Sequence, residues 1–298
     1  MIFEVSHRTH YRYATPVAQS QHLVHMTPRP AAHQTTFRHN LIVEPAPAMR
    51  HEGIDNFGNP FVELEVEVPH KELVLLARSA VETRVPVAAN LTATAAWDRL
   101  DDVLGNGSDG LDLDVIQYRC TTRITGASLA IADYARASFG QGRPVLDGAM
   151  DFTRRIYADF HFDPGATDVS TPVEQVFTQR RGVCQDFAHL ALAGLRALRV
   201  PARYVSGYIL THPPPGQPKL AGADASHAWI SVWSPETGWR DFDPTNGIEV
   251  GEEHITIAHG RDYNDVSPIS GVLIGGGEHV VTVGVDVVPL AAAPAPAI

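Results

Sequence analysis

Cys184 lies at the start of a predicted helix, a position that favours the reactive thiolate form of a cysteine. Apolar residues recur at helical spacing from Cys184 to Leu198, and Val200-Pro201 stops the pattern. Unpaired backbone N–H groups and the positive end of the helix dipole meet at a helix N-terminus, and both stabilise negative charge. Cys184 is therefore a candidate nucleophile. Cys120, the other cysteine, has no such setting and is interpreted as a bystander.

His227 is our candidate for the general base that a nucleophilic cysteine requires. The chain has 15 histidines, and this one opens a predicted strand that runs to Trp233. The turn at 234–238 leads into a partner strand that ends at Asp243, just before Pro244. A carboxylate in this position can fix the tautomer and the orientation of the histidine ring.

The register of this hairpin decides whether Asp243 reaches His227. If residue 233 pairs with 239, Asp243 lies opposite Trp229, and if 233 pairs with 237, it lies opposite His227. Either register places the side chains of Asp243 and His227 on one face of the ladder, whereas a bulge or a one-residue shift would separate them. Asp241 shares that face but lies farther from His227, so Asp243 is preferred.

Each of these residues also has an ordinary structural interpretation. Most free cysteines are small buried side chains, a histidine can be a polar residue on a sheet face, and Asp243 can cap the turn that follows it. The combination of a helix-start cysteine, a strand histidine and an aspartate on the next strand is much rarer than each residue alone. We therefore predict that Cys184, His227 and Asp243 form a triad for thiol acyl chemistry.

The elements that position this triad divide the chain into regions. Residues 1–90 alternate apolar and polar side chains between turn signals such as 56–60, which predicts an antiparallel β domain. Residues 91–127 are interpreted as a connecting segment, 128–288 as the catalytic core and 289–298 as a flexible tail. Helical periodicity precedes strand patterns in the core. The predicted fold class is α+β, with the nucleophile helix packed on an antiparallel sheet.

Composition and charge narrow the function classes. The 298 residues are 44% hydrophobic and 19% charged, which is typical of a soluble globular protein. A net charge of −11, from 23 basic and 34 acidic residues, argues against a nucleic-acid partner. We see no secretory signal and no apolar run long enough to cross a membrane, so no membrane partner is expected. Two cysteines make no disulfide framework, and a cytoplasmic, reducing location is expected.

Other candidate residues receive structural interpretations. His254, His259 and His279 lack metal-ligand spacing, so we expect no metal site. His189 faces away from the triad on helical spacing and is expected to pack. The charged cluster at 261–265 is expected to form internal ion pairs and hydrogen bonds.

The segment 211–225 lies just before His227 and is rich in proline and glycine. We predict that it forms a loop over the site, with a plain surface connection as the alternative. Three glycines at 275–277 precede a β-branched strand and not a helix, so they predict a turn and not a phosphate-binding loop.

Several motifs around these residues resemble the bacterial transglutaminase-like family, whose core is related to papain-like cysteine enzymes. In the predicted core the similar motifs occupy 182–190, 201–208, 226–229 and 243–246. The opening, with Tyr11-Arg12-Tyr13 and the run 55–59, is similar to the N-terminal β region of that family, and 260–268 is similar to its C-terminal portion. The resemblance covers most of the chain.

This resemblance implies a nucleophile at Cys184, a base at His227 and an orienting carboxylate at Asp243, on a papain-like or transglutaminase-like core. It implies a peptide or another amide-containing substrate and no cofactor. The reaction stays open between amide hydrolysis, by a protease or amidase, and transglutaminase-type acyl transfer. No departure from the family pattern is seen at the triad.

The oxyanion of such a reaction needs preorganised hydrogen-bond donors. The backbone N–H of Cys184 is the expected first donor. Gln185, Tyr204 and Trp229 are candidates for a second donor or for substrate contact.

Two other functions compete with an amide-bond enzyme. One is a non-catalytic binding or scaffold protein that keeps the transglutaminase-like shape. The other is a redox or regulatory thiol at Cys184, which is weakened by the absence of a nearby resolving cysteine. The oligomeric state is not predicted.

Overall fold

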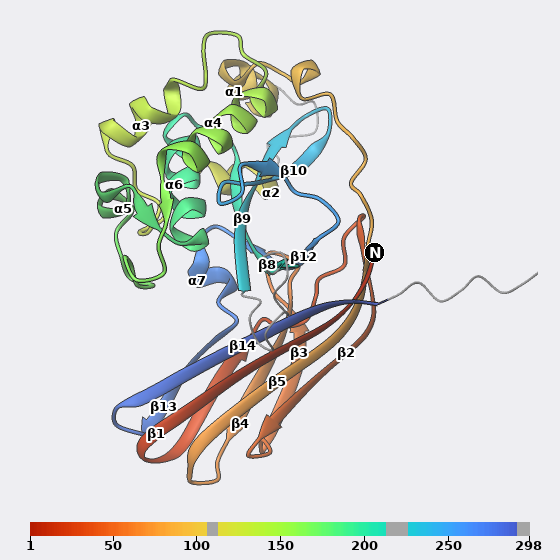
Figure 1. Ribbon diagram of the computed structural model, residues 1–298, viewed down its shortest axis with the longest axis vertical. Coiled ribbons are helices and arrows are strands. Elements are labelled where there is room, and N and C mark those ends of the chain that lie inside the picture. Colours follow the sequence, from red (N-terminus) through yellow and green to blue (C-terminus); the bar gives the residue numbers. More distant parts are fainter. Residues whose placement is uncertain (106–112, 213–225, 291–298) are drawn as a thin grey trace, which may run out of the picture.

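The computed structural model describes residues 1–105, 113–212 and 226–290. In Figure 1, helices and a five-stranded sheet form the upper part of the molecule, and a seven-stranded sheet forms the lower part. This architecture confirms the predicted α+β fold class. Within the described ranges, no helix is long and apolar enough to cross a membrane.

The lower sheet is built around one long strand, β1 (Ile2–Val24), which pairs antiparallel with four others. Its first half pairs with β5 and β14, and its second half pairs with β4 and β13. β2 and β3 extend the sheet beyond β5 and β4. The bounds are β2 (Gln34–Glu44), β3 (Met49–Ile54), β4 (Pro60–Val66), β5 (His70–Thr83), β13 (Ile269–Gly275) and β14 (His279–Leu290).

The C-terminal strands differ from the expected domain division. We expected the catalytic core to continue to residue 288, but β13 and β14 pair with β1 and so belong to the lower sheet. A strand pattern predicts a strand without naming its partner, and β1 needs neighbours on both sides to satisfy its backbone groups. Pro289 and Leu290, expected in the tail, continue β14, while 291–298 lie outside the described residues.

Short helices make up most of the connecting segment that is described. They contribute a few buried side chains, such as Leu100 and Tyr118, to the upper region. Their bounds are η1 (Leu91–Ala93), η2 (Trp97–Arg99), α1 (Leu100–Gly105), α2 (Leu113–Ile116) and η3 (Gln117–Arg119).

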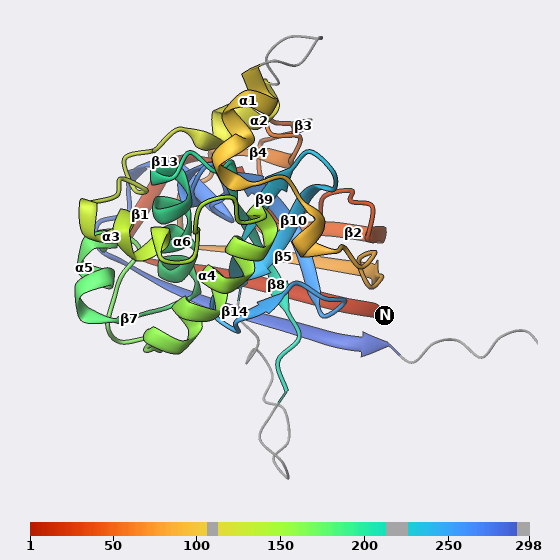
Figure 2. The same ribbon diagram turned by 90° about the horizontal axis from the view of Figure 1, so that it is seen from above.

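The upper region places five of the described helices on one side of an antiparallel sheet with the order β11-β10-β9-β8-β12 (Figures 1 and 2). The helices are α3 (Leu129–Arg136), α4 (Val145–Asp159), α5 (Val173–Gln179), α6 (Cys184–Ala197) and α7 (Tyr263–Val266). The strands of the sheet are β8 (Ala202–Ile209), β9 (Ser226–Ser234), β10 (Gly238–Asp243), β11 (Ile248–Glu249) and β12 (His254–Gly260). Two short parallel strands, β6 (His161–Phe162) and β7 (Arg181–Gly182), lie outside it.

The two regions share one apolar core. Phe3, Val5 and Val81 of the lower sheet belong to the same buried cluster as the inner faces of α4 and α6. Two amide side chains also join the regions, because Gln34 bonds both backbone groups of Thr256 and Asn59 bonds both backbone groups of His259. These bonds hold β12, and with it the five-stranded sheet, against the lower region.

Candidate active site

Cys184 is the first residue of α6, as predicted. Asp186 organises this end of the helix, since its Oδ2 accepts hydrogen bonds from the Val183 N–H at 2.8 Å and the Thr167 hydroxyl at 2.6 Å. Gly182 makes room for that carboxylate, because a Cβ at position 182 would lie 2.7 Å from Asp186 Oδ2. The turn before the helix is therefore shaped by Asp186 and by the absence of a side chain at Gly182.

The hairpin of β9 and β10 adopts the first of the two registers considered. Trp233 pairs with Trp239 and Ile230 with Phe242, so the next step of the ladder places Asp243 opposite Trp229. His227 and Asp243 lie on one face as a diagonal pair, and His227 Nε2 is 2.8 Å from Asp243 Oδ2. The His227 side chain is 8% exposed and that of Asp243 is fully buried.

Asp243 is held as a carboxylate by donors on both of its oxygens. Its Oδ1 accepts the backbone N–H groups of Thr245 and Asn246, and its Oδ2 accepts the side-chain amide of Asn246. Burial alone would raise the pKa of Asp243, but the hydrogen bonds and charges of His227 and His254 outweigh it and hold that pKa well below its usual range. The site thus contains a buried negative charge beside His227.

His227 is correspondingly held as an imidazolium. Burial alone would lower its pKa, but hydrogen bonds to Asp243 and Cys184, and the charges of both, raise the pKa to about 10. Because Nε2 is bonded to Asp243, the other ring nitrogen is the one available to the Cys184 sulfur. The structure therefore brings all three predicted triad residues together, with the histidine between the thiol and the carboxylate.

His254 is a member of this site that our sequence interpretation missed. It begins β12, its Nε2 is 3.2 Å from Asp243 Oδ2, and its ring meets the Trp229 ring edge-on at 5.2 Å. Its Nδ1 is buried without a hydrogen-bond partner among the described residues, and its Nε2 donates to Asp243. No local spacing signals this contact, because β12 pairs with β8 and not with β10.

The cluster of His227, Asp243 and His254 also has the residue types of a metal site, and its ligand atoms lie within 4.8 Å of one another. His254 has no metal-ligand spacing along the sequence, as expected, but the fold brings it to two other ligand-type residues. The pKa of His227, raised to about 10, means that a proton competes with any metal ion for the ring nitrogen. In the structure, Asp243 is joined to His227 and to His254 by hydrogen bonds.

The three candidates for the oxyanion or the substrate have different surroundings. The Gln185 amide donates to the Val169 carbonyl at 3.3 Å, and the Trp229 indole N–H donates to Asp241 Oδ2 at 3.1 Å. The single N–H of Trp229 is therefore occupied, whereas the Gln185 amide keeps a second N–H, and the roles expected for both side chains stay predictions. Tyr204 is buried, and its pKa is raised well above the usual value by burial and then by the nearby charge of Cys184. Of the three candidates, Tyr204 is the one whose pKa is affected by the charge of Cys184.

Two structural interpretations agree with the contacts. His189 is buried, accepts the Tyr263 N–H at 3.2 Å on its Nε2 and packs 5.0 Å from the Tyr204 ring. Arg261 forms an ion pair with Asp265 at 2.9 Å. The predicted loop at 211–225 lies outside the described residues for all but its first two positions.

A helix-start cysteine, held against a histidine and an aspartate of an antiparallel sheet, defines the transglutaminase-like class of cysteine enzymes. Residues 3–82 match the family described as the bacterial transglutaminase-like N-terminal region, and residues 132–244 match the transglutaminase-like superfamily. The chain belongs to the bacterial transglutaminase-like family.

Its relatives include proteins of similar length and a longer enzyme. An uncharacterized protein of Mycobacterium tuberculosis is 39% identical over 297 residues, which cover 96% of this chain and 92% of that protein. A protein-glutamine gamma-glutamyltransferase of Pseudomonas aeruginosa is 31% identical over 148 residues, or 47% of this chain and 22% of that enzyme. A solved structure from Cytophaga hutchinsonii, named as a proposed cysteine protease, has the same fold with a TM-score of 0.74 and 24% identity, over 99% of this chain and 93% of its own.

Proposed function

We propose that this protein is a cysteine-dependent amide-bond enzyme in which Cys184, His227 and Asp243 act together through a thioester intermediate. The observation that carries the proposal is the buried histidine between a thiol and a carboxylate, with its pKa raised to about 10. Burying such charges costs free energy that a plain structural role does not require. This cost argues against the scaffold interpretation.

In the proposed reaction the Cys184 thiolate attacks the carbonyl carbon of an amide and forms a tetrahedral oxyanion. The C–N bond then breaks, and the His227 imidazolium gives its proton to the departing amine. The product is an acyl thioester on Cys184 with a neutral His227. Water or a second amine next attacks the thioester while His227 accepts a proton from it, which restores the thiolate and the imidazolium. Asp243 orients His227 and stabilises its charged form throughout.

The oxyanion would be stabilised at the start of α6. The backbone N–H of Cys184 lies at a helix N-terminus, where it has no partner within the helix. We propose the Tyr204 hydroxyl as the second donor, because this buried side chain lies close enough to Cys184 to feel its charge. The Trp229 indole would have to leave Asp241 to take this role, whereas the Gln185 amide has a second N–H beside the one that is bonded to Val169.

The choice between hydrolysis and acyl transfer is tested with peptides that contain glutamine, incubated with and without cadaverine and analysed by mass spectrometry. Cleaved or deamidated peptides would identify a protease or amidase, and cadaverine adducts would identify a transferase. Cys184→Ala should give neither, whereas Cys120→Ala should behave as wild type. Absence of every product, and of an acyl adduct on the intact wild-type protein, would overturn the enzyme proposal in favour of a binding protein.

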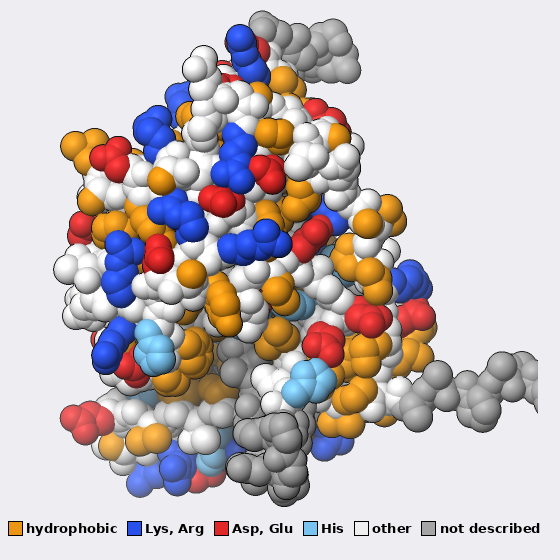
Figure 3. Space-filling model, turned by 45° about the horizontal axis from the view of Figure 1, so that its top comes forward, with side chains coloured by type: hydrophobic (Ala, Val, Ile, Leu, Met, Phe, Trp, Pro, Cys, Tyr) orange, Lys and Arg blue, Asp and Glu red, His pale blue; other side chains and the backbone are white. Residues whose placement is uncertain are grey.

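The partner and location assignments stay predictions. On the face drawn in Figure 3, basic and acidic side chains are interspersed. Both cysteines are free thiols, and the reducing, cytoplasmic location stays a prediction.

A further inference from the structure

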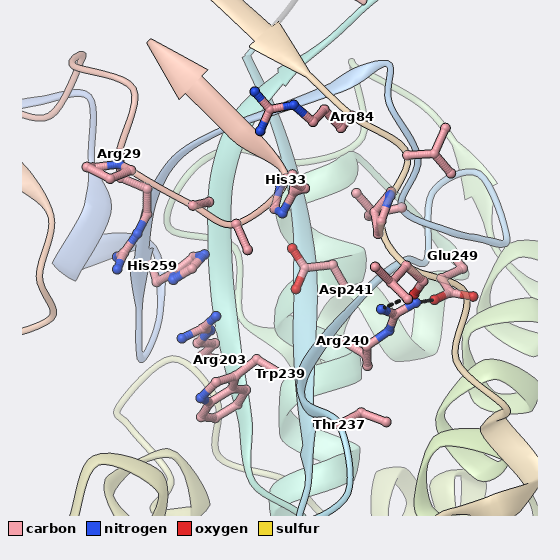
Figure 4. Close-up of a pocket in the computed structure, with 17 residues that line it drawn as sticks. Arg29, His33, Arg84, Arg203, Thr237, Trp239, Arg240, Asp241, Glu249 and His259 are labelled. Carbon is pink, nitrogen blue, oxygen red and sulfur yellow. Dashed lines mark hydrogen bonds and ion pairs between the residues drawn. The ribbon is translucent and has the colours of Figure 1, made fainter.

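A pocket lies between the two regions, apart from the triad. It has a volume of about 520 Å³ and is lined by residues of the lower region, of the chain that leads out of β5, and of the five-stranded sheet (Figure 4). None of the three triad residues is among the described residues that line it. A cavity of this size at a junction between regions is typical of a small-molecule binding site.

One end of the pocket gathers two arginines, Arg29 and Arg203, that form no ion pair among the described residues, although the charge of Asp241 acts on both. Figure 4 shows Arg29, His259 and Arg203 together at this end. Arg29 donates only to the Phe57 carbonyl and to Asn59 Oδ1 among the described residues. The Arg203 guanidinium stacks 4.3 Å above the Trp239 ring, and its Nε is buried without a hydrogen-bond partner in the part of the chain that is described.

The other arginines of the pocket are already neutralised. Arg84 pairs with Glu82, and Arg240 pairs with Glu249. In Figure 4 the Arg240 and Glu249 pair lies across the pocket from Arg29. The unpaired positive charge is therefore confined to the end that contains Arg29 and Arg203.

Electrostatics support an anion at that end. Burial lowers the pKa of Arg203 to about 10 although the nearby charge of Asp241 raises it, so the guanidinium is still charged at neutral pH. Burial, and then the charges of Arg203, Arg29 and His33, hold the pKa of His259 well below its usual range, so this imidazole is neutral. A buried guanidinium with an unsatisfied N–H is costly, and an anion with two oxygens would satisfy it bidentately.

The rest of the lining favours a carboxylate on an apolar body. Trp239 and Val250 supply apolar surface inside the pocket, and Val85 and Val87 are exposed at its rim. Asp241 also lines the pocket, with its carboxylate turned toward His33 in Figure 4. This negative charge disfavours a doubly charged phosphate more than a singly charged carboxylate.

We propose that this pocket is a binding site for a carboxylate-bearing ligand, whose carboxylate is held by Arg203 and Arg29 and whose apolar part lies against Trp239. The ligand is either a free organic acid or the C-terminal end of a peptide. The proposal goes beyond the amide-bond chemistry of the triad and does not depend on it.

Calorimetric titration of the full chain carrying Cys184→Ala tests the proposal, because this variant cannot consume a peptide. The probes are benzoate for the free acid, N-acetyl-Ala-Phe for the peptide end, the amides of both, and inorganic phosphate. We expect one carboxylate to bind at a single site and its amide to bind at least tenfold more weakly. The carboxylate that binds identifies the source. Absence of binding by both acids, or tighter binding of phosphate, would overturn the proposal.

Variants then locate the site. Arg203→Gln should weaken carboxylate binding at least tenfold, and Ala32→Trp, at an exposed lining position, should block the pocket without touching the arginines. The matched control is Arg8→Gln, which removes one positive charge from an exposed position of β1 outside the pocket. Melting temperatures show whether each variant is folded. Unchanged affinity in folded Arg203→Gln or Ala32→Trp protein would place the ligand elsewhere and refute this site.

Discussion

At the scale of single residues, Asp243 connects the chemistry of the site to its burial. It accepts hydrogen bonds from two histidines and from two backbone N–H groups of the turn that follows it. A buried carboxylate with these donors stays ionised, and its charge is what keeps a proton on His227. The reactivity of Cys184 should therefore depend on a residue that never contacts the substrate.

Asp243→Asn should slow the alkylation of Cys184 by iodoacetamide at pH 6. Without the carboxylate, burial dominates and the pKa of His227 falls, so the thiolate loses its charged partner. We expect a decrease of about 10²- to 10⁴-fold, the range typical of acid–base groups. Peptide mass spectrometry measures the rate at each cysteine, and the exposed Cys120 is an internal control. Equal Cys184 rates in both proteins would contradict the role of Asp243.

The pKa shifts of His227 and Asp243 predict how the free energy of unfolding depends on pH. The pKa of His227 is raised by folding from 6.5 to about 10, so its contribution is complete below pH 6.5 and is lost as the pH rises toward 10. The lowered pKa of Asp243 gives a contribution that is lost as the pH falls below its ordinary value of 3.8.

Urea unfolding of wild type and Asp243→Asn should thus differ most between pH 3.8 and 6.5, by about 1.5–3 kcal/mol, and converge toward pH 10. Subtracting the two free energies of unfolding at each pH cancels the titration of the other groups, which both proteins share. A difference that grows as the pH rises would be incompatible with a protonated His227.

His254 should act as a positioning residue for Asp243. Its removal in His254→Ala takes one donor from the carboxylate, so we expect kcat to fall about tenfold with KM little changed, using a peptide found in the screen above. The pKa of His227, followed by NMR, should rise further because Asp243 becomes a stronger acceptor. His254→Gln, which keeps an N–H donor, should recover activity, and the exposed His51→Ala is the matched control. An unchanged pKa of His227 would leave His254 with a packing role only.

At the scale of elements, the N-terminus of α6 is shaped by a glycine and a buried acid. Gly182 is tightly enclosed by the Asp186 carboxylate, which bonds the backbone one residue before the nucleophile. The sheet contributes in the same way, since the turn after β10 fixes Asp243 through its own backbone. Hydrogen bonds at the start of α6 therefore place Cys184, and hydrogen bonds at the end of β10 place Asp243.

Gly182→Ala should displace Asp186 and disturb the start of α6. We expect a loss of about 1–3 kcal/mol in the free energy of unfolding, together with slower alkylation of Cys184. Gly140→Ala is the matched control, because a Cβ there meets nothing within 4 Å. Equal stabilities for these two variants in urea unfolding would show that Asp186 moves aside without cost.

At the scale of the whole molecule, the lower sheet is joined to the enzyme core by both apolar and polar contacts. Gln34 and Asn59 each satisfy a backbone N–H and a backbone C=O of β12. β12 also carries His254 at its start and His259 near its end. The position of the lower region therefore affects the geometry of both the triad and the pocket between the two regions.

Gln34→Ala and Asn59→Ala should each destabilise the protein by about 1–3 kcal/mol, because each leaves two buried backbone groups of β12 without partners. The double variant should lose about the sum of the two, measured by urea unfolding. Asn40→Ala, at an exposed position of β2, is the matched control and should be neutral. Single variants as stable as this control would show that apolar packing alone joins the regions.

The sequence was sufficient for features that depend on near neighbours. The start of α6 at Cys184 follows from the spacing of its own apolar residues, and the face shared by His227 and Asp243 follows from the parity of one hairpin. The α+β fold class follows from the same local periods.

Only the tertiary structure decided the features that join separate segments. Three features depend on the order of the strands and on how the two sheets meet. They are the pairing of β13 and β14 with β1, the contact of His254 with Asp243, and the pocket that contains Arg29, Arg203 and Trp239. Local spacing shows that a strand forms and which faces it has, but its partner is chosen by packing that involves the whole chain.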